Sequence, residues 1–389
     1  MRKITITNIR KEISGVKLKL LADVINEESN KDILYFETSL CYDSEINEYA
    51  DPFLVATLFY AMRSNSDIHI EDKLTYGLLR NIERFQKVWC CWKPELYHKI
   101  NITADEIIDI NHNVKGKAIQ TFSGGLDSTF TTYQHVKKIA GKYSHNLTTA
   151  VMVHGFDIPL EDEHIYQDIF SRSKKVLATV GVELIPLKTN FRDLWHKDLK
   201  YWEHAFGTGM SASILLFARN HSYGLIASSE PYNSLLLPWG SNPISDPFLS
   251  SSNFIIEHDA CEYTRGEKVS FVSDWSDGIN NLRVCWQGND IRYNCCRCEK
   301  CIRTILNFKS IKRPVPLSFP LDINIDDIIS LRGMSEAHLN PLRQIIAEAI
   351  KHDINDKWVD AVKQVISINE KDISDGIVVA GQLPYVLKG

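Results

Sequence analysis

The sequence lacks several features that would assign it to a large class of proteins. No apolar run approaches the roughly 20 residues that a helix needs to cross a bilayer. The first residues, Met1-Arg2-Lys3 and then alternating Ile and Thr, lack the apolar core of a signal peptide. Positive charge is not in excess, since 44 Lys and Arg stand against 49 Asp and Glu. We therefore expect a cytoplasmic protein without membrane association or a general attraction to nucleic acid.

The composition is that of an ordinary globular protein. Of the 389 residues, 44% are hydrophobic and 24% are charged, which leaves room for two or three domains with a large core. The nine cysteines are unevenly spread, because five of them fall in one short stretch. These five are Cys285, Cys295, Cys296, Cys298 and Cys301. Disulfides do not persist in a reducing cytosol, so this cluster predicts a metal site.

Hydrophobic periodicity divides the chain into three predicted parts. Residues 1–113 mix strand and helix patterns and predict an α+β accessory module, with a buried helix over 52–62. Residues 114–310 alternate strands with helices, which predicts an α/β domain with a parallel sheet covered by helices on both faces. Residues 311–389 predict a helical extension. The predicted strands of the middle part are 117–122, 147–153, 182–187, 223–228 and 255–259, and its helices include 126–139, 165–180 and 205–219.

The stretch 121–129, Thr-Phe-Ser-Gly-Gly-Leu-Asp-Ser-Thr, follows the first of these strands and opens the first helix. Two consecutive glycines allow backbone conformations that turn N–H groups toward an anion. The hydroxyl groups nearby and the first turn of the helix add further donors. The residues predicted to hold a phosphate are Ser123, Gly124, Gly125, Leu126, Ser128 and Thr129. An ordinary glycine turn with Ser and Asp as helix caps is the alternative.

An acid stands inside this loop where other phosphate loops carry a base. No lysine follows the glycines, which distinguishes the stretch from the Gly-Lys-Ser/Thr loop that grips β- and γ-phosphates. Asp127 is an acid among predicted phosphate ligands, and such an acid is favourable when it binds Mg²⁺. We therefore predict that Asp127 is catalytic through a bound Mg²⁺.

Polar residues follow the other predicted strands, where ligands of parallel sheets bind. The backbone of Val153 is predicted to contact adenine, and Asp157 to face the same pocket. Lys188 is predicted to neutralise charge that develops on an α-phosphate, and Glu230 to contact the substrate. Taken singly, such residues are more often helix caps or solvated loop residues, which is the alternative.

His204 begins the pattern His-x-x-Gly-x-Gly immediately before the predicted helix at 205–219. We predict an acid/base or phosphate-binding role for His204, with a structural histidine as the alternative. In the loop that follows the fourth strand, Trp239 is predicted to stack on a planar substrate or to fill the core. Ser241 and Asp246 are predicted to bind the polar edge of that substrate, and Arg265 to bind a carboxylate or phosphate.

Four cysteines have the spacing of a metal site. Cys285, Cys295, Cys298 and Cys301 form Cys-x9-Cys-x2-Cys-x2-Cys, in which the short spacings let thiolates converge on one ion. Four thiolates favour Zn²⁺ in a structural role. An iron–sulfur cluster and reduced cysteines without metal are the alternatives. Cys296 is out of register with the repeat and is left outside the predicted site.

The Ser-Gly-Gly-x-Asp-Ser loop resembles that of the PP-loop ATP pyrophosphatases, whose fold is that of the adenine nucleotide α-hydrolases. Together with the cysteine cluster it resembles the 7-cyano-7-deazaguanine synthases of the queuosine pathway, over about residues 115–307. The resemblance implies ATP, Mg²⁺ and Zn²⁺ as cofactors. It implies adenylation of a deazaguanine carboxylate, attack by ammonia with loss of AMP, and a second adenylation that dehydrates the amide to a nitrile.

The sequence also departs from that family. The family's Tyr-Pro-Asp-Cys-Arg substrate loop is missing, and Pro-Trp-Gly-Ser-Asn-Pro occupies the corresponding region at 238–243. The added terminal parts resemble enlarged relatives in anti-phage operons, some of which resemble ligases that join a deazaguanine to a protein amine. We expect these parts to dock a protein partner or substrate, or to form a homo-oligomer. A non-catalytic subunit of a defence complex and a tRNA-thiolating PP-loop enzyme are the alternative functions.

Overall fold

The computed structural model describes residues 2–110, 116–197, 199–285, 287–288, 290–377 and 385–386. The predicted boundary between residues 113 and 114 lies outside these ranges. The strands are β1 (Arg2–Ser14), β2 (Lys17–Ile25), β3 (Lys31–Ser39), β4 (Ser66–Thr75), β5 (Ile102–Ile108), β6 (Lys117–Thr121), β7 (Asn146–His154), β8 (Glu183–Thr189), β9 (Tyr223–Ala227), β10 (Ile255–Asp259), β11 (Leu331–Arg332) and β12 (Tyr385–Val386).

The helices, like the strands, follow the sequence pattern closely in most places. They are α1 (Asp51–Ser64), α2 (Tyr76–Trp92), α3 (Leu126–Val136), α4 (Glu163–Ala178), α5 (Phe191–Trp195), α6 (Leu199–Leu215), α7 (Arg265–Val272), α8 (Ser276–Asn280), α9 (Glu299–Ser310), α10 (Ile325–Ile329), α11 (Glu336–Lys351) and α12 (Lys357–Ser374). Short 3-10 helices are η1 (Leu40–Glu45), η2 (Gly141–Tyr143), η3 (Tyr232–Ser234) and η4 (Asp246–Leu249). Among the described residues, no helix combines the length and apolar character needed to cross a membrane.

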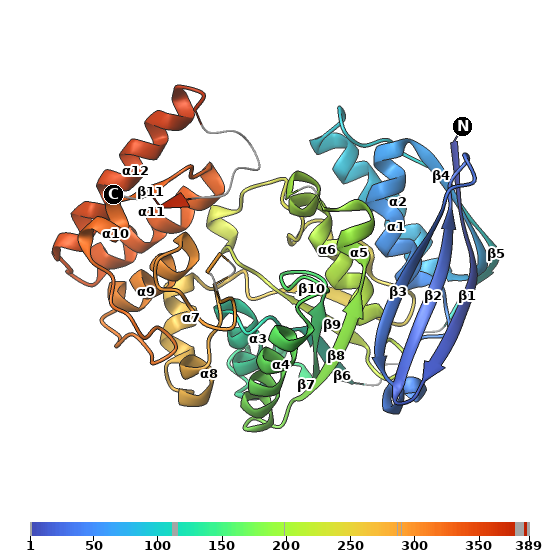
Figure 1. The fold of residues 1–389 in the computed structure, drawn as a ribbon, viewed down its shortest axis with the longest axis horizontal. Helices are drawn as coiled ribbons and strands as arrows, with labels where there is room; N and C mark the ends of the chain where they lie inside the picture. Colours follow the sequence, from blue (N-terminus) through green and yellow to red (C-terminus); the bar gives the residue numbers. More distant parts are fainter. Residues whose placement is uncertain are drawn as a thin grey trace.

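A ten-stranded sheet runs through the molecule in the order β10-β9-β6-β7-β8-β3-β2-β1-β4-β5 (Figure 1). Strands β10, β9, β6, β7 and β8 pair in parallel, as do β1 with β4 and β4 with β5. The predicted α/β class with a mostly parallel sheet and helices is confirmed. From β6 the chain adds β7 and β8 on one side and β9 and β10 on the other. This reversal is a topological switch point, where open α/β sheets bind ligands.

The first 110 residues belong to the same sheet as the middle of the chain. Strand β3 pairs antiparallel with β8, with Phe36 opposite Thr189 and Glu37 opposite Lys188. Asn190 extends this junction, because its Oδ1 accepts from the Tyr35 N–H at 3.0 Å and its Nδ2 donates to the Ile33 carbonyl at 2.7 Å. The predicted accessory module is therefore continuous with the sheet of the middle part of the chain through backbone pairing.

The sheet separates two hydrophobic cores, because successive side chains of a strand point to opposite faces. Ala118 and Ala150 belong to one core with Phe130 of α3, while the adjacent Ile119 and Val151 belong to the other. Helices α3, α4, α7 and α9 contribute to the first core, and α1, α2 and α6 to the second. The predicted helical C-terminal part is present as α10–α12, whose apolar side chains continue the first core.

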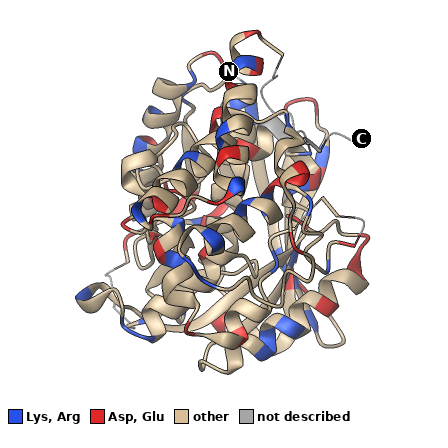
Figure 2. Cartoon of the chain, turned by 90° about the vertical axis from the view of Figure 1, so that its left-hand side faces the viewer, with Lys and Arg blue, Asp and Glu red and all other residues tan. Residues whose placement is uncertain are grey.

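Charged residues of both signs are interspersed over the face of the molecule drawn in Figure 2. The helices of the C-terminal part lie on that side of the molecule (Figure 1). The chain carries a formal net charge of −5.

Replacing Asn190 with Ala removes both side-chain hydrogen bonds across the β3–β8 junction. We expect the free energy of unfolding to fall by about 1–3 kcal/mol, because β3 loses partners for two backbone groups. Urea unfolding followed by fluorescence measures this loss. Asn101→Ala at an exposed position is the control and should change stability by less than about 0.5 kcal/mol. Equal stability of the two variants would show that the junction does not depend on Asn190.

Candidate functional site

A cavity of about 460 Å³ lies beyond the carboxyl ends of β6, β7 and β9, at the switch point of the sheet. Its wall includes residues from the Ser-Gly-Gly turn, from β7, from the loop after β9, and from α7, α9 and α11. The predicted site residues that line it are Ser123, Gly125, Leu126, Asp127, Ser128, Val153, Asp157, Glu230, Trp239, Ser241, Arg265 and Cys285. Most residues singled out from separate stretches of sequence therefore meet around one cavity.

The Ser-Gly-Gly turn has a left-handed backbone conformation that glycine adopts without strain. Gly124 has a φ of +78°, in the left-handed region that side chains rarely adopt, and Gly125 is the N-cap of α3. Ser128 Oγ accepts from the Ser123 N–H at 3.3 Å and donates to the Gly125 carbonyl at 3.2 Å, which closes the loop. Thr129 is only 2% exposed and does not line the cavity, so its predicted phosphate contact lacks access. The first N–H groups of α3 have no acceptor within the helix.

Asp127 meets two cations from α7. Arg265 Nη1 donates to Asp127 Oδ2 at 2.7 Å, and Lys268 Nζ lies 3.6 Å from Asp127 Oδ1. Lys268 is fully buried and donates to the Ser228 carbonyl at 2.6 Å, so it also fastens the end of β9. Burial lowers the pKa of Lys268, and the charge of Asp127 opposes that shift. Asp127 Oδ1 has no hydrogen-bond partner among the described residues.

The start of α7 explains why Arg265 points at the loop. Thr264 and Glu267 form a capping box, in which the Thr264 hydroxyl accepts from the Glu267 N–H and the Glu267 carboxylate accepts from the Thr264 N–H. Arg265 and Lys268 are three residues apart and so share one face of the helix. That spacing is visible in the sequence, but the prediction from the sequence concerns Arg265 alone.

The pattern at 204–209 has a different role from the predicted one. Helix α6 begins at Leu199 and not at Ala205, so Gly207 and Gly209 lie inside it and do not form a helix N-terminus. A Cβ on Gly207 would lie 2.0 Å from the Gly240 carbonyl oxygen, and Gly240 donates from its N–H to the Glu203 carbonyl at 2.9 Å. Gly207 and Gly240 therefore allow α6 to contact the loop that carries Trp239 at the cavity.

His204 and Lys188 do not line the cavity. His204 Nδ1 lies 2.7 Å from the Tyr97 hydroxyl, and its ring packs on Trp89, so it joins α6 to the N-terminal part. Lys188 Nζ donates to Glu163 Oε2 at 2.8 Å. The reason is tertiary packing, because α6 lies against the N-terminal part of the chain and Glu163 of α4 lies within reach of Lys188 on β8. The structure therefore gives neither residue access to a phosphate in this cavity.

A buried cluster of Ser241, Asp246 and His258 lies in the cavity wall. Asp246 Oδ2 accepts from Ser241 Oγ at 2.6 Å and from His258 Nδ1 at 2.8 Å. Asp246 is fully buried and does not line the cavity itself. It orients the side chains of Ser241 and His258, which do line the cavity. Burial lowers the pKa of His258, but the hydrogen bond and charge of Asp246, together with Cys261, raise it to about 9.

Glu230 is held by the C-terminal part. Its Oε2 accepts from Asn340 Nδ2 at 3.2 Å and from Gln344 Nε2 at 2.9 Å, both on α11. Burial raises the pKa of Glu230, while the charge of Arg303 opposes that shift. Ala337 and His338 of the same helix line the cavity. The sequence predicts only a helical extension here, because no motif marks the contact of α11 with Glu230 and the cavity.

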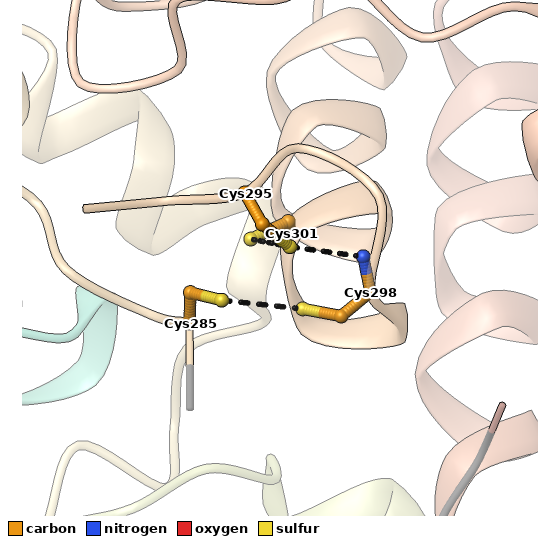
Figure 3. A group of neighbouring side chains, drawn as sticks. All are labelled: Cys285, Cys295, Cys298 and Cys301. Atoms are coloured by element: carbon orange, nitrogen blue, oxygen red, sulfur yellow. Dashed lines mark hydrogen bonds between the residues drawn. The ribbon is translucent and has the colours of Figure 1, made fainter. Parts of the chain in front are cut away.

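Cys285, Cys295, Cys298 and Cys301 converge to form a cluster able to hold a metal ion such as zinc (Figure 3). All four sulfur atoms lie within 4.8 Å of one another. The sulfurs of Cys285 and Cys298 are 3.8 Å apart, and those of Cys295 and Cys301 are 3.9 Å apart. A zinc–sulfur distance of about 2.3 Å gives a tetrahedron with edges of about 3.8 Å, so the geometry fits zinc.

The backbone around the cluster supports thiolate ligands. The N–H groups of Arg297 and Cys298 donate to Cys295 Sγ at 3.4 and 3.3 Å. A Cβ on Gly288 would meet Cys285 Sγ and Cys295 Cβ at 3.2 Å, so glycine leaves room for the sulfurs. The thiol of Cys296 instead donates to the Asn294 carbonyl at 3.6 Å, which keeps it apart from the four ligands.

Comparisons of the chain with protein-family models, with curated proteins and with solved structures find no match.

Replacing Cys298 with Ser should abolish metal binding and lower the thermal midpoint, because one thiolate ligand is lost and three remain around an incomplete site. Elemental analysis should find about one zinc ion per chain in the wild type and a small fraction of that in the variant. Cys296→Ser is the matched control in the same segment and should retain metal. Full metal content in Cys298→Ser would contradict the assignment.

The free energy of unfolding should fall between pH 6.5 and about pH 9. The pKa of His258 is higher in the folded chain than its ordinary value, so its contribution is complete below pH 6.5 and is lost as the pH rises through about 9. Urea unfolding across this range should show a smaller fall in His258→Gln. The exposed His98→Gln is the control and should follow the wild type. An identical pH dependence in His258→Gln and the wild type would refute the pairing.

Proposed function

We propose that the protein is an ATP-dependent enzyme that adenylates a carboxylate, with release of pyrophosphate and later of AMP. We further propose that the carboxylate belongs to a 7-deazaguanine and that ammonia or an amine attacks the adenylate. One observation carries this proposal: the Ser-Gly-Gly-Leu-Asp-Ser turn follows the central strand β6 at the switch point and borders the cavity. A phosphate loop at this position resembles the PP-loop arrangement, and phosphate sites of α/β proteins form at such junctions.

The charges around the turn support a polyanionic ligand. Arg265 and Arg283 both line the cavity, and the Lys268 ammonium lies 3.6 Å from Asp127 Oδ1. Buried cations are favourable when an anion offsets the loss of hydration. In this proposal the N–H groups of the turn and the hydroxyls of Ser123 and Ser128 hold the leaving pyrophosphate.

Asp127 fits the proposed Mg²⁺ site. Its Oδ1 is buried without a hydrogen-bond partner, and a carboxylate oxygen of this kind is a typical magnesium ligand. Its Oδ2 is engaged by Arg265 at 2.7 Å, which fixes the orientation of the carboxylate beside the turn. A bound Mg²⁺ supplies positive charge to phosphate oxygens, and Asp127 would hold it there.

The remaining wall suits a flat aromatic substrate with a polar edge. Trp239 and Phe206 have ring centroids 5.9 Å apart and both line the cavity, together with Phe156 and Trp202. Glu230 and Ser241 supply acceptors for the N–H groups of such a ring. The volume of about 460 Å³ is within the usual range of small-molecule pockets, roughly 300–1,000 Å³. We also propose that the metal of the cysteine cluster is zinc, in a structural role beside this cavity.

Asp127→Asn should lower pyrophosphate release at least about a hundredfold, because the amide keeps the shape of the side chain but supplies no negative charge to a metal ion. The assay incubates protein with ATP, Mg²⁺, carboxy-deazaguanine and ammonium, and measures pyrophosphate, AMP and products by mass spectrometry. The exposed Asp274→Asn is the control and should keep the wild-type rate. Circular dichroism checks the fold of both variants. Undiminished release by Asp127→Asn would exclude this role for the acid.

A further inference from the structure

Arg283 is a cavity residue that no sequence motif marks. Its N–H donates to the Gly124 carbonyl at 2.8 Å, which places it against the Ser-Gly-Gly turn. Its side chain is 8% exposed and lines the cavity, and its Nε donates to the Ile291 carbonyl at 2.8 Å. Its Nη2 is buried and has no hydrogen-bond partner among the described residues.

The charge of Arg283 has no direct counterion. Among the described residues, no carboxylate lies within ion-pair distance of it, although the charges of Asp157 and Cys285 act on it from farther away. A desolvated guanidinium with an unpartnered N–H group is costly unless a ligand completes its contacts. An anion in the cavity would do so.

Arg265 supplies a second guanidinium that has a buried N–H group without a hydrogen-bond partner, although it also pairs with Asp127. It is 6% exposed, it lines the cavity, and its Nε is buried without a hydrogen-bond partner while its Nη1 holds Asp127. Arg283 contacts the turn through Gly124, and Arg265 contacts Asp127 in the first turn of α3. Two guanidinium groups near one loop can contact several oxygens at once. They therefore match a polyphosphate better than they match a ligand with a single anionic group.

The backbone connects Arg283 to the cysteine cluster. Arg283 precedes Cys285 by two residues, and the N–H groups of Val284 and Cys285 donate to Asn294 Oδ1 at 2.9 and 3.2 Å. Asn294 is the neighbour of Cys295 in the chain. A metal ion that joins Cys285 to Cys295 would therefore fix the segment from which the Arg283 side chain extends.

We propose that Arg283 is an anion-binding residue for a polyphosphate, and that the metal of the cysteine cluster holds it in position. Metal binding and polyphosphate binding are then coupled, and the coupling is reciprocal. The choice of polyphosphate as the ligand class rests on the proposed function. The cysteine cluster acts on the nucleotide site by positioning this arginine in addition to stabilising the fold.

The first experiment measures binding of inorganic pyrophosphate in the presence of Mg²⁺ by calorimetry. Arg283→Met should weaken binding about tenfold to a hundredfold, as expected for the loss of charge-assisted hydrogen bonds. Arg283→Lys, which keeps the charge but loses the fork, should fall between this variant and the wild type. Arg292→Met is the matched control, because Arg292 pairs with Asp290 and Asp168 on the surface of the same segment. It should bind like the wild type.

The second experiment measures release of the metal to an excess of chelator from the full chain. Saturating pyrophosphate should slow release several-fold in the wild type and in Arg292→Met, and should have no effect in Arg283→Met. This readout is independent of catalysis and also reports whether each variant retains its metal site.

Equal pyrophosphate affinity of Arg283→Met and Arg292→Met would overturn the role of Arg283. Equal protection of the metal in both variants would overturn the coupling. In either case, pyrophosphate release from ATP by the wild type would leave the proposed function intact. Absence of both binding and release in the wild type would overturn the proposed function together with this inference.

Discussion

The contact of Asp127 with Arg265 and Lys268 brings three parts of the chain together. Asp127 belongs to the first turn of α3, the two cations belong to α7, and Lys268 also holds the carbonyl of Ser228 at the end of β9. Buried charges are costly unless they are paired, so this contact constrains where α7 can pack. The floor of the cavity depends on that position, because the turn after β6 and the end of β9 are both adjacent to it.

The rest of the fold supports this cavity from two directions. Strand β3 extends the parallel sheet beyond β8, and His204 and Tyr97 join α6 to the N-terminal part. On the opposite side, Asn340 and Gln344 of α11 hold Glu230. The N-terminal part therefore supports the sheet at a distance from the cavity, whereas the C-terminal part contributes directly to its wall.

The cysteine cluster relates to the cavity through a short segment. Cys285 lines the cavity and also belongs to the cluster, and the segment from Arg283 to Cys285 contacts the Ser-Gly-Gly turn at Gly124. The N–H groups of this segment donate to the Gly124 carbonyl and to Asn294 Oδ1, so backbone hydrogen bonds hold it between the cluster and the turn. In the coupling proposed above, metal binding and anion binding share the free energy of ordering that segment.

The sequence by itself determined the features that depend on neighbours along the chain. The alternation of strand and helix patterns predicts the α/β class, and the glycine pair predicts the turn at Gly124. The short cysteine spacings predict the cysteine cluster. Each of these features depends on residues close together in the chain, because backbone angles, helix periodicity and the convergence of closely spaced ligands are local properties. Three contacts depend on tertiary packing: the ion pair of Lys188 with Glu163, the contact of His204 with Tyr97, and the hydrogen bond from the Arg283 N–H to the Gly124 carbonyl. These contacts join residues far apart in the chain, and their geometry depends on strand order and helix packing, which local spacing does not encode.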